Sequence, residues 1–418
     1  MQVWILQTGE PLHCDAGNPR PMRAMNLANA LVERGHYVVI WSSAFYHQEK
    51  MHRSRSQTTI KISDLLEIRL IPSCGYDRNV GIERLKDHFQ MARNLKTALV
   101  DQSHPDVVFV GYPPIETATV MTRWTRQRGI PTVVDVKDQW PHYFLGAVPS
   151  IARPLLRILL APYFYLGRRA LRDASGLTSM SKSFLEWAAE FRGSPVGPRD
   201  AVFALTASGS QCLESDLSDA SRWWDDQGVK LDHQFRIMFV GSFAPSFDFA
   251  AITTAARNLL ALNLEIEFIL CGDGQDATRL RELVGDLSNV RVFDWIDRPK
   301  IETLAERCVA MIAPYRNIDN FTMNLPNKIL DGLSLGLPIL TSLNGEVERL
   351  ITEHSVGMRY GEAPSPALTD CVIRLYQDRD FLASLSSNAK ALYEREFRND
   401  YVYGRMSDYL IGLTKLSP

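Results

Sequence analysis

Two charged side chains at the expected start of a helix carry the clearest chemistry in the second half of this sequence. An apolar run ends at Pro314, a polar loop follows, and a helix is predicted to begin near Asn327. Lys328 then lies in the first helical turn, where lysine is unfavourable against the helix dipole unless an anion is bound there. We therefore predict a diphosphate at this N-terminus, beside Lys328. Asp331, one turn further along the same face, suits vicinal ribose hydroxyls. A solvated lysine and a surface aspartate are the alternatives.

Glycine turns follow two apolar runs of the same half. Gly241 and Ser242 follow the first run, and Gly272 and Gly274 follow the second. At the carboxyl end of a parallel strand, glycine lets a ligand approach the backbone next to helix N-termini. These turns are predicted donor-binding positions, although an ordinary strand-to-helix turn has the same pattern.

A glycine-punctuated loop in the first half has a related arrangement. It contains Gly9 and Gly17 and leads into a helix with Arg20 and Arg23 at its start. Such a loop faces the carboxyl edge of a parallel sheet, where ligands bind. We predict these four residues on the side of the site that receives the acceptor.

Two aspartates end a later predicted strand of the first half. Asp135 and Asp138 are followed by Trp140, Pro141 and His142. A carboxylate in this position can accept the proton of an attacking hydroxyl or orient that hydroxyl, as general base catalysis requires. We predict Asp138 as a catalytic residue and His142 as an acceptor-side residue. In the alternative, Asp135 caps the following turn and only Asp138 is functional.

Short apolar runs alternate with stretches of helical periodicity through both halves, which predicts parallel sheets covered on both faces. The first set spans residues 1–195 and the second spans 235–395. Between them, 196–234 is rich in Gly, Pro, Ser and Asp, as expected of a linker. A C-terminal helix at about 396–418 is expected to pack back on the first domain.

These motifs carry a family resemblance. The stretch from Gly241 to Gly357, above all Asn-Lys-x-x-Asp-x-x-x-x-Gly-x-Pro-Ile from Asn327 onward, resembles the donor domain of family 4 retaining glycosyltransferases. The similar branch is bacterial and assembles O-antigens and exopolysaccharides. In the first half, the resemblance continues through the loop after Thr8, 105–114 and 133–141. It implies a GT-B fold, with two doubly wound Rossmann-like α/β domains facing an interdomain cleft.

The resemblance also implies roles for residues of the donor domain. Asp331 takes the place of a glutamate that holds the donor ribose, and Lys328 that of the lysine on the diphosphate side. Residues 324–327, including Asn324 and Asn327, would line the donor sugar and phosphate through backbone amides. Trp295 and Ile296 lie where the nucleobase is contacted.

The sequence departs from the family pattern at two places. Members of the family commonly carry two acidic residues eight positions apart. Asp331 stands at the second of these positions and Met323 at the first, and Asp319 is the candidate to replace the missing acidic residue. The usual Arg and Lys after the first donor-domain strand are absent from Gly241–Pro245.

The function implied is transfer of a sugar from a nucleotide diphosphate sugar to a saccharide or polyprenyl-diphosphate-linked acceptor, with retention, in surface polysaccharide or glycoconjugate synthesis. No metal cofactor is expected, since the donor half lacks a clustered Asp-x-Asp at a strand end. The two departures motivate an alternative, a non-catalytic nucleotide-sugar-binding partner of a synthase complex. A nicotinamide-dependent oxidoreductase does not fit, because Gly9 followed by Gly17 is not Gly-x-Gly-x-x-Gly.

Bulk properties restrict partners and location. The 418 residues have a formal net charge of -2, which gives no overall attraction to nucleic acid. The six cysteines are scattered singly and the N-terminus lacks signal-peptide features, so a cytoplasmic protein is expected. The stretch from Ile151 to Arg172 combines leucines with arginines, which suits either a helix lying on an anionic membrane at its inner face or a buried core helix with arginine ends. The basic loop Lys50–Arg55 favours the first interpretation.

Overall fold

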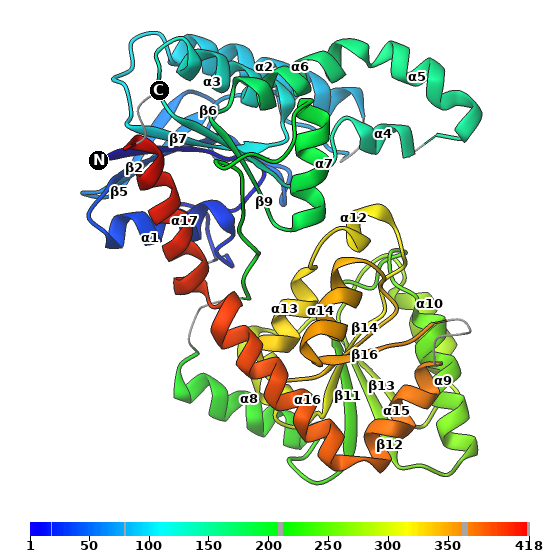
Figure 1. The fold of residues 1–418 in the computed structure, drawn as a ribbon. Helices are drawn as coiled ribbons and strands as arrows, with labels where there is room; N and C mark the ends of the chain where they lie inside the picture. The colour runs from blue at the N-terminus through cyan, green and yellow to red at the C-terminus, as the bar shows by residue number, and fades with distance from the viewer. Residues whose placement is uncertain (18, 79–80, 147, 208–211, 362–366, 416–418) are drawn as a thin grey trace. The chain divides into compact units, whose positions relative to one another are not determined.

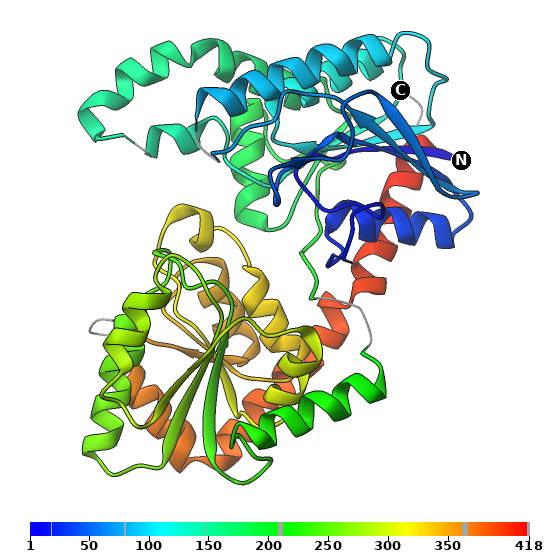
Figure 2. The same ribbon diagram turned by 180° about the vertical axis from the view of Figure 1, so that it is seen from behind.

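The computed structural model describes residues 1–415 except 18, 79–80, 147, 208–211 and 362–366, and it divides into two compact units. Unit 1 combines Met1–Ala204 with Asn399–Pro418, and unit 2 is Leu205–Arg398. In each unit helices cover both faces of a largely parallel sheet, as the opposite views in Figures 1 and 2 show. The predicted fold class, two Rossmann-like α/β domains, is confirmed.

The sheet of unit 1 has the order β10-β9-β8-β7-β1-β2-β6-β5, and only the β5–β6 pair of this sheet is antiparallel among the described residues. A small hairpin, β3 with β4, stands apart from it. The order reverses between β1 and β7, so a crevice is expected outside the carboxyl ends of these two strands. The strands are β1 (Gln2–Leu6), β2 (Tyr37–Ser43), β3 (Phe45–Tyr46), β4 (Met51–His52), β5 (Thr58–Ser63), β6 (Leu66–Ile71), β7 (Val107–Tyr112), β8 (Thr132–Val136), β9 (Gly176–Ser179) and β10 (Ala201–Val202).

Alternating side chains of the strands form two core layers in unit 1. Trp4 and Leu6 of β1 belong to one layer, whereas Val3 and Ile5 belong to the other. The first layer is covered by α2 (Ile82–Ala98), α3 (Ile115–Arg126), α6 (Ala161–Asp173) and α7 (Lys182–Arg192). The second layer is covered by α1 (Arg23–Glu33) and the C-terminal α17 (Asn399–Thr414), which pack on each other.

The stretch from Ile151 to Arg172 is two helices rather than one. A short 3-10 turn (Ser150–Ala152) leads into α5 (Arg153–Leu159), and α6 starts at Ala161 with Pro162 in its first turn. Proline lacks an amide N–H, so it suits a new helix start and not a helix interior. In α6, Tyr163, Gly167, Ala170 and Leu171 are buried, whereas none of the seven described side chains of α5 is buried. Helix α6 therefore packs in the core, whereas α5 lies on the surface of unit 1, and contact of α5 with a membrane stays a prediction.

Unit 2 is built on a six-stranded parallel sheet with the order β13-β12-β11-β14-β15-β16. Its order reverses between β11 and β14, which puts the expected binding crevice outside their carboxyl ends. The strands are β11 (Phe235–Val240), β12 (Ile266–Cys271), β13 (Val290–Phe293), β14 (Ala310–Ala313), β15 (Ile339–Thr341) and β16 (Gly357–Arg359). The helices are α8 (Glu214–Asp226), α9 (Phe249–Ala261), α10 (Ala277–Val284), α11 (Arg298–Ala305), α12 (Asp319–Thr322), α13 (Asn327–Ser334), α14 (Glu346–His354), α15 (Leu368–Gln377), α16 (Arg379–Leu392) and the π-helical turn Tyr393–Phe397.

Part of the expected linker 196–234 is a folded element of unit 2. Helix α8 packs on α11, and Trp224 is fully buried there. The indole N–H of Trp224 donates to the carbonyl of Lys300 at 2.9 Å, and its ring lies 5.1 Å from that of Phe293. The sequence analysis missed this helix because the segment is mostly polar. One buried tryptophan is nevertheless enough to dock a short amphipathic helix. Among the described residues, the helices are too short or too polar to cross a membrane.

Candidate active site

Glycines that leave no room for a side chain stand at the carboxyl ends of β11 and β12, where the crevice of unit 2 is expected. Gly241 follows β11 and Gly272 follows β12, with φ angles of +143° and +154°. A Cβ on Gly272 would lie 1.9 Å from the carbonyl oxygen of Gly241, so only glycine fits. The predicted glycine turns are therefore places where two strand ends approach closely. A Cβ on Gly274 would similarly lie 2.6 Å from the carbonyl oxygen of Phe243.

Lys328 lies at the same edge of the sheet. It lies in the first turn of α13, and its ammonium donates to the carbonyl oxygen of Val240 at 2.6 Å. The ammonium lies 4.9 Å from the ring centre of Phe239, and a Cβ on Gly241 would lie 1.6 Å from it. The structure thus brings Lys328, the N-terminus of α13 and the glycine turn after β11 together, which suits a phosphate group.

The other predicted donor residues lie on the loop after β14 and on α13. Asp331 is half-buried near Tyr315, whose phenol pKa is raised by burial and further by the negative charge of Asp331. Asp319 is exposed as the first residue of α12, and its carbonyl accepts from the amide of Met323 at 3.1 Å. The side-chain oxygen of Asn324 accepts from the Leu325 amide at 2.9 Å, and Asn327 is exposed at the start of α13. Ser242, which is also exposed, lies apart from this group, in the turn after β11.

Trp295 and Ile296 follow the edge strand β13, which β12 separates from β11. The Trp295 side chain is 64% exposed, whereas Ile296 is buried. An exposed indole at the carboxyl edge of the sheet offers a flat surface for stacking, but Ile296 can contribute only through its backbone.

In unit 1, Asp138 lines a cavity of about 390 Å³. One of its carboxylate oxygens accepts from the Gln139 amide at 2.8 Å. Burial raises the pKa of Asp138, and the Gln139 amide and the nearby charge of Arg84 partly offset this rise. Arg84 lines the same cavity and was not predicted from the sequence, because it stands in α2 and nothing in its neighbourhood in the chain relates it to Asp138.

Arg23 has a structural place inside unit 1. Its guanidinium is buried and makes a two-point pair with Asp135, at 2.7 and 2.9 Å. The Thr178 hydroxyl also donates to Asp135, at 2.8 Å. The charges of Arg23 and Asp135 neutralise each other inside the unit, because a buried carboxylate needs partners on each oxygen. The predicted acceptor-side role of Arg23 is therefore not supported, and Asp135 is the partner of that arginine.

His142 also has a structural place. It begins the short helix α4 (His142–Gly146), and its ring lies 4.9 to 5.3 Å from those of Phe164, Trp187 and Phe191. Burial lowers the pKa of this imidazole, and nearby arginines lower it further. His142 packs α4 against α6 and α7, so its predicted acceptor-side role is not supported.

The predicted loop of unit 1 is held by a network. Gly9 and Gly17 have left-handed φ angles of +76° and +80°, and Arg20 is exposed. Arg53 of the basic loop Lys50–Arg55 pairs with Asp15 at 2.5 Å, so this arginine fastens the loop internally. Glu10, which the sequence analysis did not single out, accepts from the first-turn amide of Ala24 at 2.9 Å and pairs with Lys137.

Two family models match the chain, one in each unit. Residues 22–203 match a glycosyl transferase 4-like domain, and residues 234–378 match glycosyl transferases group 1. Together with the two doubly wound sheets, these matches decide the identity. The chain is a GT-B glycosyltransferase.

Solved structures share the fold of this glycosyltransferase over its whole length. Sucrose-phosphate synthase from Thermosynechococcus elongatus is 13% identical, with 100% of each chain covered and a TM-score of 0.69. WaaG, a glycosyltransferase involved in lipopolysaccharide biosynthesis, is 15% identical, with 99% and 100% covered and a TM-score of 0.63. Anabaena Alr3699/HepE in complex with UDP-glucose is 14% identical, with 99% and 100% covered and a TM-score of 0.62. No curated protein sequence matches the glycosyltransferase.

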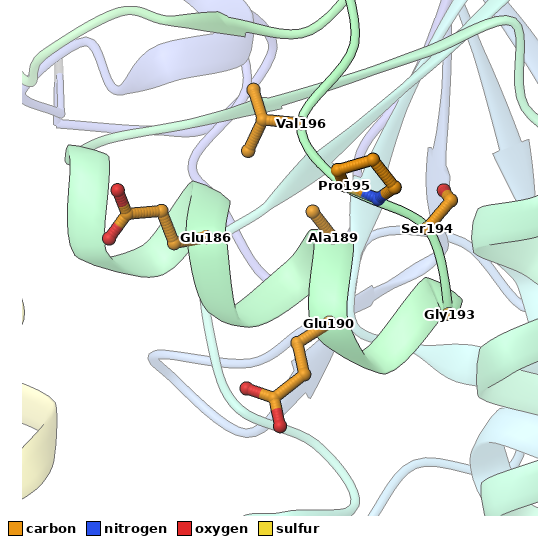
Figure 3. Close-up of a pocket in the computed structure, with 7 residues that line it drawn as sticks. All are labelled: Glu186, Ala189, Glu190, Gly193, Ser194, Pro195 and Val196. Carbon is orange, nitrogen blue, oxygen red and sulfur yellow. The ribbon is translucent and has the colours of Figure 1, made fainter.

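A second cavity of the glycosyltransferase lies at the C-terminal end of α7 and has a volume of about 510 Å³. Figure 3 shows Glu186 and Glu190 on one side of α7, with their carboxylates pointing away from Pro195. Ligands of such sheets bind outside the carboxyl ends of the strands. The C-terminus of α7 lies at the opposite edge of the sheet. This cavity is therefore outside the candidate active site. Within the described parts of the chain, no cluster of His, Cys, Asp and Glu suits a metal ion.

Proposed function

We propose that this nucleotide-sugar-dependent glycosyltransferase acts on a saccharide or polyprenyl-diphosphate-linked acceptor, with retention at the anomeric carbon. The product would be a surface polysaccharide or glycoconjugate. One observation carries the proposal: the Lys328 ammonium lies beside Gly241 at the carboxyl end of β11, where the N-terminus of α13 also points. A diphosphate at this place meets a fixed cation and helix amides. Retention rests on the resemblance of the motif around Lys328 and Asp331 to family 4 enzymes.

The donor would bind in unit 2 in an extended arrangement. Lys328 and the turns at Gly241, Gly272 and Gly274 hold the diphosphate, and the carboxylate of Asp331 accepts hydrogen bonds from the ribose. Trp295 stacks on the base while the backbone of Ile296 contacts its edge. The loop with Asp319 and Asn324 surrounds the sugar. Anabaena Alr3699/HepE, a protein of the same fold, has been solved with UDP-glucose, which supports UDP sugars as the first donors to try.

The acceptor hydroxyl would meet Asp138 in unit 1. Burial raises the pKa of this carboxyl, and a raised pKa brings a carboxylate closer to the range in which it accepts protons efficiently. In this scheme unit 1 supplies the carboxylate that receives the proton of the acceptor, and unit 2 holds the donor. No divalent metal is required in this scheme, because Lys328 and the α13 amides neutralise the leaving diphosphate.

We also propose a cytoplasmic enzyme in peripheral contact with the inner face of a membrane. The contact lies on α5 rather than on the arginines of α6. Arg168 and Arg172 donate to the carbonyls of Phe191 and Arg192, whereas the apolar side chains of α5 are turned outward. The involvement of WaaG, a relative in fold, in lipopolysaccharide synthesis supports a substrate at a membrane surface.

The proposal is tested by titrating the full chain with UDP and UDP-glucose in a calorimeter, followed by an assay for UDP release. Binding and release of UDP support a transferase. Binding of nucleotide sugars without any turnover would instead identify the non-catalytic partner of a synthase complex, which the Met323 position motivates. Absence of binding to a panel of nucleotide sugars would reject the donor site.

A further inference from the structure

Asp138 stands in a short turn between the end of β8 and the start of α4. Tyr112, the last residue of the neighbouring strand β7, makes hydrogen bonds on both sides of it. The backbone carbonyl of Tyr112 accepts from the Lys137 amide at 3.0 Å, and its hydroxyl donates to the carbonyl of Trp140 at 2.7 Å. The first bond continues the parallel β7–β8 ladder, whereas the second requires a tyrosine at this position. One residue therefore holds the segment 137–140 at both ends.

The hydroxyl of Tyr112 is enclosed by the core of unit 1. Tyr112 is fully buried, and burial raises the pKa of its phenol well above the ordinary value, so the hydroxyl stays protonated and can donate. Gly167 of α6 makes room for it, because a Cβ on Gly167 would lie 2.6 Å from the hydroxyl oxygen. A buried carbonyl that lost this donor would not regain a partner from water. The bond to Trp140 is therefore a persistent restraint.

The side chain of Trp140 passes this restraint on to Asp138. Its indole ring lies 4.7 Å from the ring of Phe144, and the Arg84 guanidinium stands 5.0 Å from its ring centre. Asp138 accepts hydrogen bonds from the Gln139 amide, at 2.8 Å, and from the Trp140 side chain. Both donors belong to the restrained segment, so the position of the carboxylate depends on how firmly that segment is held.

The turn needs this restraint from outside. Residues 137–140 belong to neither a helix nor a strand, so no regular backbone pattern fixes them. A general base must lie within hydrogen-bond reach of the proton that it accepts, and a misplacement of about 1 Å can lower a rate about a hundredfold. The hydroxyl of Tyr112 is thus placed to decide whether the Asp138 carboxylate is in reach.

We propose that Tyr112 is a positioning residue for the transfer reaction, which acts through the turn at 137–140 to hold the Asp138 carboxylate where it receives the proton of the acceptor. This inference rests on the proposed function, in which Asp138 has that role. Tyr112 is fully buried, so it acts through the turn and not by contact with a substrate.

Tyr112→Phe removes the hydroxyl and keeps the ring and the ladder bond. With UDP-glucose as donor and water as acceptor, kcat for UDP release should fall by about tenfold to a hundredfold, and KM for UDP-glucose should stay unchanged. In the background of Asp138→Asn the same substitution should lower kcat no further, because the group that it positions is already lost. A general loss of structure would instead lower kcat in both backgrounds and would overturn the inference.

Tyr409→Phe is the matched control. The Tyr409 hydroxyl also donates to a backbone carbonyl, that of Arg199 at 2.6 Å, and a Cβ on Gly176 would lie 2.8 Å from it. Gly176 begins β9 and Arg199 precedes β10, so this bond lies at the amino ends of the strands, whereas Asp138 follows a carboxyl end. The control should release UDP like the wild type. Unchanged kcat in Tyr112→Phe, or an equal loss in Tyr409→Phe, would overturn the inference.

An NMR titration of the Asp138 carboxyl separates this inference from the proposed function. In protein with isotope-labelled aspartate carboxyl groups, the Asp138 signal is the one that Asp138→Asn lacks. Its pKa should be raised by burial in the wild type and in Tyr409→Phe. In Tyr112→Phe the pKa should return toward the ordinary aspartate value, because the released turn exposes the carboxylate to water.

The same pKa of Asp138 in Tyr112→Phe and in the wild type would overturn the inference, whatever the rates of UDP release. If the wild type released no UDP from UDP-glucose, the proposed function would fail for this donor. The NMR titration would then still decide whether Tyr112 holds Asp138 in place.

Discussion

The Lys328 ammonium lies 2.6 Å from the carbonyl oxygen of Val240, the last residue of β11. This bond ties the first turn of α13 to the end of the neighbouring strand and fixes a positive charge at the crevice of unit 2. The same charge stands over the rings of Phe239 and Phe247, at 4.9 and 5.4 Å. A cation already held in position loses little freedom when a diphosphate binds.

Replacement of Lys328 by Gln should therefore weaken donor binding. Hydrogen bonds to charged groups contribute roughly 1.5 to 3 kcal/mol, so we expect affinity for UDP-glucose to fall by about tenfold or more. Calorimetric titration measures the loss. Lys300→Gln is the control, since Lys300 pairs on the surface of α11 with Asp297 at 3.4 Å. Equal affinities of Lys328→Gln and the wild type would place the diphosphate elsewhere.

Asp331→Asn tests the ribose contact. The substitution keeps the shape of the side chain and removes the charge that would accept hydrogen bonds from two hydroxyls, so donor affinity should fall by about tenfold or more. The loss should be similar for UDP and UDP-glucose, because both carry the same ribose. A variant that discriminated between these two ligands would indicate that Asp331 contacts the donor sugar instead.

Removal of divalent metal should leave the enzyme active. Lys328 and the N-terminus of α13 supply the positive charge that a metal ion supplies to diphosphates in other enzymes. Initial rates of UDP release in EDTA, and after addition of manganese, check this expectation. Loss of turnover in EDTA with recovery in manganese would show that the leaving group depends on a metal ion.

The fold was predictable because its strands are short apolar runs separated by helical periodicity. Strands β8 and β12 are buried along their whole length, and apolar residues therefore predominate in both. The hairpin formed by β3 and β4 was missed, since two-residue strands carry no periodic signal. Helix α8 was missed because its buried surface depends on one tryptophan within a polar segment.

The candidate site was predictable only where its signal is local. Lys328 and Asp331 are three positions apart on one helix, so their common face follows from the helical repeat. The partner of Arg23 lies 112 residues away in the chain, and nothing near Arg23 distinguishes a buried ion pair from a ligand contact. Arg84 is the converse case, because its relation to Asp138 arises only when α2 and the loop after β8 form one cavity.

Glu116 should make the stability of the protein depend on pH. Its carboxyl is buried in α3, accepts from the Tyr163 hydroxyl, and has its other oxygen 3.7 Å from the imidazole of His88. Burial raises the pKa of Glu116 to about 7, from an ordinary value of 4.5. The native state therefore keeps a proton that the unfolded state loses, and stability falls as pH rises from 4.5 to 7.

Glu116→Gln removes that cost while keeping an acceptor for Tyr163. At pH 8 the variant should be more stable than the wild type by up to about 3 kcal/mol, and near pH 4.5 the two should be almost equal. Urea unfolding at both pH values measures the difference. The exposed Glu190→Gln on α7 should change stability little at either pH. A stability difference independent of pH would mean that Glu116 is not protonated in the native state.

The membrane contact proposed for α5 gives the last prediction. Ile151, Leu155, Ile158 and Leu159 are 73 to 91% exposed, and Arg153 and Arg157 stand among them. Insertion of these apolar side chains and attraction of the arginines, about 1 kcal/mol each near an anionic surface, would act together. Wild-type protein should float with phosphatidylglycerol vesicles at low salt.

The double variant Leu155→Asp, Leu159→Asp should lose flotation and keep its circular dichroism spectrum, because exposed substitutions usually change stability by about 0.5 kcal/mol or less. The triple variant Arg168→Glu, Arg169→Glu, Arg172→Glu is the comparison. Its arginines contact Phe191, Asp173 and Arg192 within unit 1, so it should float more weakly than the wild type but better than the α5 variant. If the triple variant alone lost flotation, the contact would be electrostatic and centred on α6. If the wild type did not float at low salt, the acceptor would have to reach the enzyme from solution.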